Sequence, residues 1–210
     1  GDKLRSGEAA GPDSIEEQWK IGKAQMVPFG LGQFDESRLI SGAQGTIGVI
    51  TWATMKCRPL FEFTRTHLIA SDTLEPLIDL SYRLTRIRLG DTCFIVNDLN
   101  LAVLLAKTPE EISSLRAALP EWVLVVTFEG SGPLPKEKVE YQEADFQDML
   151  RQGGNLESIA VIGGYSAEDV GATISRPSEE PYWKLRYKGT CADIFFLTTL
   201  DKTPVFNEAM

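Results

Sequence analysis

The sequence predicts an α+β fold, in which a mostly antiparallel sheet is covered by helices on one face. Short apolar segments with period-two alternation are interspersed with segments whose apolar residues recur every three or four positions. The two kinds of segment alternate irregularly, which favours an antiparallel sheet over a regular strand–helix repeat. Of the 210 residues, 43% are hydrophobic and 24% are charged, which is typical of a globular protein that buries a core.

Apolar segments define the strands expected in this sheet. Residues 60–70 alternate Phe61 and Phe63 with polar neighbours, a pattern typical of a strand with one wet face. Residues 92–96 and 99–106 are expected to pair as a hairpin through the turn-forming Asn97-Asp98. Further strands are expected at 121–130, 156–165 and 191–200.

Capping signals define the expected helices. Thr108 is expected to cap a helix with Pro109 at its first position and Glu111 completing a capping box. Another helix is expected to end at Gly153 and Gly154. The sheet is expected to carry its helices on one face in a ferredoxin-like arrangement. These helices are expected at 74–88, 109–119 and 137–152, with shorter helices after Ser14 and within 166–175.

Charge and cysteine usage exclude several classes of function. The net charge of −9 repels phosphate backbones, so no nucleic-acid partner is expected. No segment approaches about 18 unbroken apolar residues, so no membrane-spanning helix is expected. Cys57, Cys93 and Cys191 are too widely spaced for a metal pair or a disulfide framework, which favours a cytoplasmic protein. His67 is the sole histidine, so no metal site is expected.

A glycine-rich segment, SGAQGTIGVITWATMKCRPL, spans residues 41–60 and carries three glycines in its first eight residues. Glycine normally weakens a strand, because it adds backbone entropy and offers no side chain to pack. Glycines at the start of a strand therefore indicate that the backbone approaches something closely. That partner is either a ligand or the chain itself, in a tight structural turn.

This segment resembles the closing segment of the FAD-binding domain in the FAD-linked oxidase family of the vanillyl-alcohol-oxidase type. Family members carry Gly-Thr-(Leu/Ile)-Gly-(Ile/Val)-(Ile/Val)-Thr there, and residues 45–51 read GTIGVIT, with Arg58-Pro59 following. The upstream stretches DKLRSGE and FDESRLISGAQG are similar to family text as well. The resemblance implies that residues 1–58 are the C-terminal end of an FAD-binding domain and that residues 59–210 are a substrate or cap domain.

The resemblance also implies FAD as the cofactor, bound largely by the backbone of the glycine segment. The implied cofactor-binding residues are Ser41, Gly42, Gly45, Thr46, Gly48, Val49 and Ile50. The family's main phosphate loop, Pro-x-Gly-Gly-Gly-Thr, is absent from this sequence, as is a flavin-tethering histidine motif. The chain is therefore expected to be a fragment or a subunit whose partner supplies the rest. Alone, it is expected to bind FAD weakly or not at all, and residues 1–58 are expected either to make it self-associate, for example as a homodimer, or to order poorly.

Two side chains are catalytic candidates. His67 lies in the expected strand 60–70 and is either an acid or base that faces the flavin or a packed strand histidine. Tyr187 lies in the basic aromatic stretch YWKLRYK at 182–188, which suits either an aromatic or carboxylate substrate or a solvated edge strand. No Gly-Asp-Gly-Asn motif or histidine cluster is present, which argues against a metal-dependent hydroxy-acid dehydrogenase.

The function expected from the resemblance is that of an FAD-dependent oxidoreductase that oxidises a small organic substrate by hydride transfer to the flavin. The alternative from another class is a non-catalytic α+β domain that binds a ligand or a partner subunit and never meets flavin. The presence of stoichiometric flavin distinguishes the two.

Overall fold

The computed structural model describes residues 15–20, 42–43, 45–51, 53, 60–153, 156–175 and 197–209. By its internal contacts the chain divides into two units, Gly1–Arg58 and Pro59–Met210, and each is described by itself. In the first unit, α1 (Ile15–Lys20) is a short helix where the sequence predicts one. The second unit contains the sheet.

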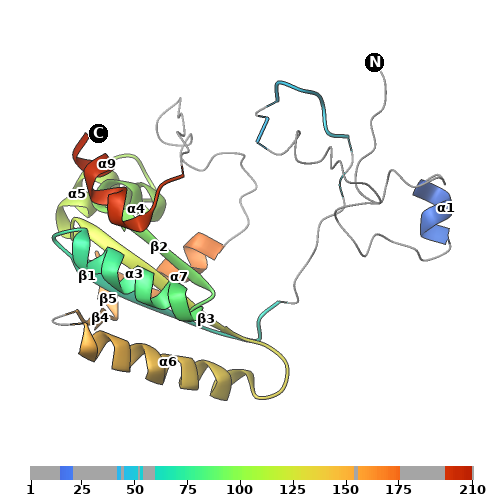
Figure 1. Cartoon of the computed structure of the whole chain (residues 1–210). Helices are drawn as coiled ribbons and strands as arrows, with labels where there is room; N and C mark the ends of the chain where they lie inside the picture. The colour runs from blue at the N-terminus through green and yellow to red at the C-terminus, as the bar shows by residue number, and fades with distance from the viewer. Residues whose placement is uncertain are drawn as a thin grey trace. The chain divides into compact units, whose positions relative to one another are not determined.

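The sheet of the second unit has four strands in the order β2-β3-β1-β4, and every neighbouring pair is antiparallel (Figure 1). β1 pairs with β3 over its whole length, with Phe63 opposite Gly130. β4 pairs with β1 only through Leu68 and Ile69. The expected α+β class with a mostly antiparallel sheet is confirmed. The strands are β1 (Phe63–Ser71), β2 (Thr92–Asn97), β3 (Trp122–Gly130) and β4 (Ser158–Ile159).

Two helices connect the strands in the way that a ferredoxin-like arrangement requires. α3 (Glu75–Ile87) joins β1 to β2, and α6 (Pro135–Gln152) joins β3 to β4 (Figure 1). Two further helices lie between β2 and β3, and without them the chain order is the β-α-β-β-α-β of the ferredoxin-like motif. Both helices contribute to one buried cluster with the sheet, in which Leu80, Phe146 and Phe128 are fully or almost fully buried. The helices predicted at 74–88 and 137–152 therefore lie on one face, as expected.

The expectation that all the helices lie on that face is wrong. α4 (Asp98–Leu105) and α7 (Ala167–Ser175) pack on the opposite face with Val123 and Val125 of β3. Leu115, from the helix predicted at 109–119, packs on the same cluster. The physical reason lies in β3, where successive residues from Val123 to Phe128 are all buried. A strand that is apolar on both faces needs cover on both.

The hairpin predicted through Asn97 and Asp98 is also wrong, because residues 98–105 form the helix α4. Asn97 caps that helix, and its Oδ1 accepts a hydrogen bond from the backbone N of Asn100 at 2.9 Å. The segment is apolar on all sides and short, so its periodicity cannot separate a helix from a strand. The capping asparagine is the local feature that selects the helix.

The helix predicted to begin at Thr108 begins instead at Glu111, as α5 (Glu111–Ala118), with Glu110 at the N-cap. The Thr108 cap and the position assigned to Pro109 are therefore wrong. The Glu111 carboxylate still reaches back, and accepts from the backbone N of Lys107 at 2.9 Å. The predicted end of α6 is confirmed, since the backbone N of Gly153 donates to the Met149 carbonyl at 3.0 Å.

The strand predicted over 156–165 is broken into shorter pieces. β4 ends at Ile159, and β5 (Val161–Ile162) and β6 (Tyr165–Ser166) form a separate two-stranded sheet. Of the strand predicted over 191–200, residues 191–196 lie outside the described residues. The described remainder leads into η2 (Leu200–Lys202) and α9 (Thr203–Ala209).

Helix α7 begins with a reciprocal cap. The backbone N of Asp169 donates to Ser166 Oγ at 3.0 Å, and the backbone N of Ser166 donates to Asp169 Oδ2 at 3.2 Å. The Ser166 hydroxyl also donates to that oxygen at 2.7 Å. This bond, and then the bond from the Ser166 backbone N, hold the pKa of Asp169 below its usual value. Ser-x-x-Asp at a helix start is a capping box that the sequence displays at 166–169.

Replacing this cap is expected to weaken the fold. Ser166→Ala should lower the free energy of unfolding by about 1 kcal/mol at neutral pH. Because the pKa of Asp169 is depressed in the folded state, its contribution is present above the unfolded pKa and is lost as the pH falls through the folded pKa. Urea unfolding at a series of pH values measures both effects. Ser114→Ala, in the exposed interior of α5, is the matched control, and an equal loss in both variants would contradict the assignment.

Candidate functional site

The glycine segment contains a tight turn. Gly42 and Gly45 have φ values of +80° and +79°, in the left-handed region that glycine adopts without steric cost. The backbone N of Thr46 donates to the Ala43 carbonyl at 3.0 Å, and the Thr46 hydroxyl donates to the same oxygen at 2.6 Å. One of the two alternatives for these glycines, a structural turn, is therefore present.

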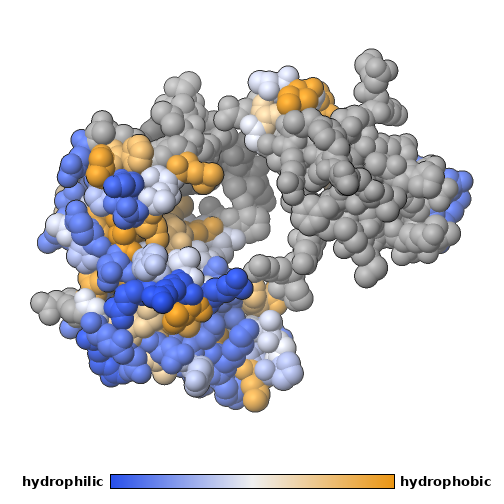
Figure 2. Space-filling view, in the orientation of Figure 1, coloured by the Kyte–Doolittle hydropathy of each residue, from blue (hydrophilic) through white to orange (hydrophobic). Residues whose placement is uncertain are grey.

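The turn also leaves the backbone open to an approaching group. A Cβ added at Gly42, Gly45 or Gly48 would meet nothing within 4 Å in the described part of the chain. Val49 is 89% exposed and Ile50 is 66% exposed. Figure 2 shows hydrophobic residues at the surface of this segment, whose trace is light blue in Figure 1. The strand expected to follow the glycines is not found in the described residues 47–51, which belong to no strand and are exposed.

The resemblance implies a bound dinucleotide at this segment. The exposed branched side chains would suit a flat apolar ring, whereas the Thr46 N–H is already bonded to the Ala43 carbonyl within the turn. All the implied cofactor contacts except Ser41 lie in this open stretch, and Ser41 lies outside the described residues. The turn and the ligand alternatives are thus compatible in the same backbone.

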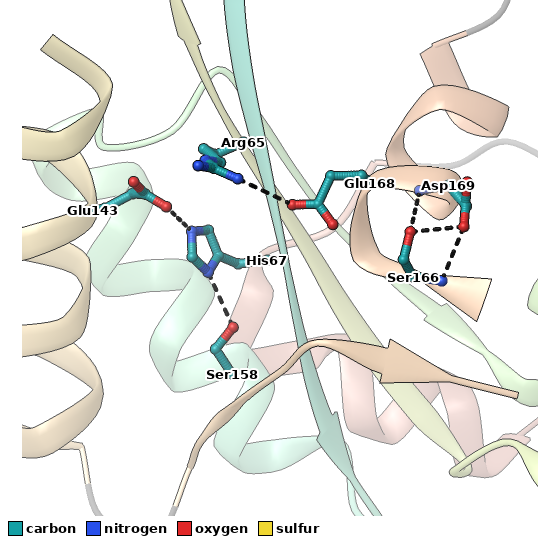
Figure 3. A network of polar contacts seen from close by, with 7 residues as sticks. All are labelled: Arg65, His67, Glu143, Ser158, Ser166, Glu168 and Asp169. Carbon is teal, nitrogen blue, oxygen red and sulfur yellow. Dashed lines mark hydrogen bonds and ion pairs between the residues drawn. The ribbon is translucent and has the colours of Figure 1, made fainter. Parts of the chain in front are cut away.

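His67 lies at the centre of a separate polar network in the second unit (Figure 3). Its Nε2 is 2.8 Å from Glu143 Oε1 on α6, and its Nδ1 is 3.0 Å from Ser158 Oγ on β4. Ser158 pairs with Ile69 across the sheet, which places its side chain on the same face as His67. When Glu143 accepts the Nε2 proton, Nδ1 is the acceptor for the Ser158 hydroxyl.

The imidazole is also packed between the sheet and α6. Its ring centroid lies 5.6 Å from that of Phe128 and 5.2 Å from that of Phe146, and its side chain is only 15% exposed. Both ring nitrogens have protein partners, and the ring contacts are those of a core residue. The geometry therefore favours the packed strand histidine over an acid or base facing a flavin.

The hydrogen bond between His67 and Glu143 is expected to stabilise the packing of α6 on the sheet. Glu143→Ala should lower the free energy of unfolding by about 1 kcal/mol, because it leaves a largely buried imidazole nitrogen without its partner. Glu140→Ala is the control. It removes an exposed ion pair with Lys136 on the same helix and should lower the free energy of unfolding by at most about 0.5 kcal/mol. Thermal unfolding at neutral pH compares them, and an equal effect would contradict the structural role.

An ion pair connects β1 to α7. Arg65 Nη1 lies 3.6 Å from Glu168 Oε1 (Figure 3). The guanidinium carbon of Arg65 is 5.3 Å from the centre of the Phe63 ring. Both charged side chains are about half exposed, so the pair contributes little to stability. It tethers α7 to the strand that carries His67.

His67 can be singled out from the sequence, but its hydrogen-bond partners cannot. Glu143 and Ser158 lie 76 and 91 residues further along the chain, in a helix and a strand whose contact only the fold creates. Tyr187 and the surrounding stretch 182–188 lie outside the described residues, as do Cys57 and Cys191.

Other kinds of site find no support in the part of the chain that the structure describes. No cluster of three or more potential metal-ligating side chains occurs there. The helices seen in those ranges are all too short or too polar to cross a bilayer. Comparison with protein-family models and with curated proteins finds no match for this chain.

Proposed function

We propose that this chain is part of an FAD-dependent oxidoreductase of the FAD-linked oxidase type. Residues 1–58 end its FAD-binding domain, and residues 59–210 form its substrate domain. The observation that carries the proposal is the glycine turn at 42–51, where a backbone in the left-handed region lies open and exposed apolar side chains follow it directly. The resemblance of this segment to the family's closing motif implies that the ligand of this backbone is FAD.

Each part of the turn has a distinct task in this proposal. Gly42, Gly45 and Gly48 let the main chain come within hydrogen-bonding distance of the cofactor, because no Cβ intervenes. Thr46 positions the turn through its two bonds to the Ala43 carbonyl. Val49, with its neighbour Ile50, presents apolar surface. The bound FAD supplies the redox chemistry by accepting a hydride from a small organic substrate.

The remaining phosphate-binding backbone comes from elsewhere in this proposal. The sequence contains no Pro-x-Gly-Gly-Gly-Thr loop, so residues outside it, or a partner subunit, provide most of the cofactor contacts. The exposed Ile47, Val49 and Ile50 are the side chains that such a neighbour, or a second copy of the chain, would cover. The widely spaced cysteines support a cytoplasmic location.

The flavin content of the protein tests the proposal. The protein expressed from the complete reading frame, together with any partner subunit, should carry about one FAD per chain, released by denaturation and measured by absorbance. The 210-residue chain alone should bind added FAD with a dissociation constant weaker than about 1 μM, because it offers few of the contacts that must offset the lost freedom of the ligand. A colourless complete protein would refute the flavin assignment. Submicromolar binding of FAD by the chain alone would refute the claim that other residues supply most of the cofactor contacts.

A further inference from the structure

A polar pocket lies at one end of the sheet, wholly inside the second unit. Its volume is about 500 Å³, within the range of sites that hold small molecules. It forms where the end of β2, the starts of α4 and β3, the last turn of α5, and α9 come together (Figure 1). The side chains that matter for its chemistry are Asn97, Asp98, Arg116, Glu121, Trp122 and Asn207.

The sheet fixes one side of this pocket. Asn97 pairs with Trp122 at the last position of the β2–β3 ladder. One residue further on, the backbone N of Asp98 donates to the Glu121 carbonyl at 3.0 Å. These bonds hold four of the lining residues on adjacent, paired backbone. The backbone on this side of the pocket is therefore preorganised.

Arg116 is aimed by an ion pair. Its Nε donates to Asp98 Oδ2 at 2.8 Å, and the Asp98 side chain is only 21% exposed. This bond uses one edge of the guanidinium. Its two terminal nitrogens have no hydrogen-bond partner among the described residues. A guanidinium held by one edge presents a planar pair of donors that matches a carboxylate.

The charges of the lining select the class of ligand. Asp98 and Glu121 bring two carboxylates and Arg116 brings one guanidinium, so the ionised pocket carries one excess negative charge. Two carboxylates disfavour a phosphate dianion, and the guanidinium disfavours a simple cation. A small molecule with both a carboxylate and an ammonium group complements the two signs together. Trp122 also lines the pocket, and an indole face attracts cations.

We propose that this pocket binds a small zwitterion of the α-amino acid class. The ligand's carboxylate accepts from the terminal N–H groups of Arg116, and its ammonium group donates to the Glu121 carboxylate. The Asn97 Oδ1 is occupied by its two bonds from Asn100, so Asn97 offers its Nδ2 and Asn207 its side-chain amide to a polar side chain of the ligand. The pocket lies within residues 97–207, so its occupant does not depend on a flavin at the glycine turn.

Calorimetric titration of the full chain with each standard L-amino acid tests this site. At least one should bind with a dissociation constant below about 1 mM. The N-acetyl and the carboxamide derivatives of that amino acid each lack one charge and should bind at least about tenfold more weakly. Absence of binding by every amino acid up to about 10 mM would overturn the proposal. So would equal binding of the N-acetyl derivative or of inorganic phosphate, since either would mean a simple anion site.

Two variants locate the binding. Arg116→Gln and Glu121→Gln should each weaken binding of the best amino acid by about tenfold. Arg151→Gln is the matched control, because Arg151 forms an exposed ion pair with Asp148 on α6 and does not line the pocket. Unchanged affinity in both pocket variants would overturn the proposal. Glu121 is exposed and its substitution leaves the Asp98–Arg116 pair in place, so Glu121→Gln decides the matter if Arg116→Gln fails to fold.

Discussion

Phe128→Ala is expected to lower the free energy of unfolding of the second unit by about 3–5 kcal/mol, the usual cost of emptying a large buried aromatic site. Phe128 is fully buried on β3, and its ring centroid lies 5.5 Å from that of Phe146 on α6. His67 contacts both rings. The cavity left by the truncation would open between the sheet and α6, where the surrounding backbone is held by strand pairing and cannot collapse into it.

Urea unfolding followed by far-UV circular dichroism measures this effect. Tyr82→Ala, which truncates an exposed aromatic on α3, is the control and should change the free energy of unfolding by at most about 0.5 kcal/mol. If Phe128→Ala does not fold, Phe128→Leu provides the measurable variant, with an expected loss of about 1 kcal/mol. A loss below about 1 kcal/mol for Phe128→Ala would contradict a core built around this ring.

Much of the fold is predictable from local patterns. The helices 75–87 and 135–152 are long and periodic, and Gly153 ends the second of them where expected. The strand 63–71 has one polar face and the strand 122–130 is mostly apolar. In such segments a helical or strand periodicity extends over enough residues to exclude the other.

The second face of the sheet is less predictable, because it depends on competition between local signals. The segment 98–105 is apolar all round, so only the Asn97 cap distinguishes helix α4 from a strand. The burial of β3 on both faces is visible in the unbroken run of apolar residues from Val123 to Val126. That run, rather than the helix count, is the feature that requires helices on both sides.

The candidate sites also differ in how far the sequence alone predicts them. The glycine segment is recognisable because its chemistry is local, and Gly42 and Gly45 do adopt the conformation that only glycine favours. The partners of His67 depend on the docking of α6 and β4, which no short-range pattern encodes. The polar pocket depends on the meeting of segments as distant as Asn97 and Asn207.

Gly45→Ala is expected to weaken FAD binding by the complete protein by about tenfold or more, as measured by fluorescence titration after removal of the flavin. The added methyl group meets nothing within 4 Å in the described part of the chain, so a loss of affinity comes from contact with the ligand or from the strain of a side chain at φ +79° within the turn. A methyl group forced into a well-packed contact typically costs about 1–3 kcal/mol, and about 1.4 kcal/mol corresponds to a factor of ten.

The comparison of Gly45→Ala with Gly132→Ala is the most direct test of the flavin assignment. Gly132 has φ of +76° and open space around its missing Cβ, so both substitutions impose the same backbone strain, but Gly132 lies in the second unit, outside the turn at 42–51. We predict that Gly132→Ala retains the FAD affinity of the unsubstituted protein, whereas Gly45→Ala loses it by about tenfold or more. Equal FAD affinity in the two variants would contradict a cofactor held by the glycine turn.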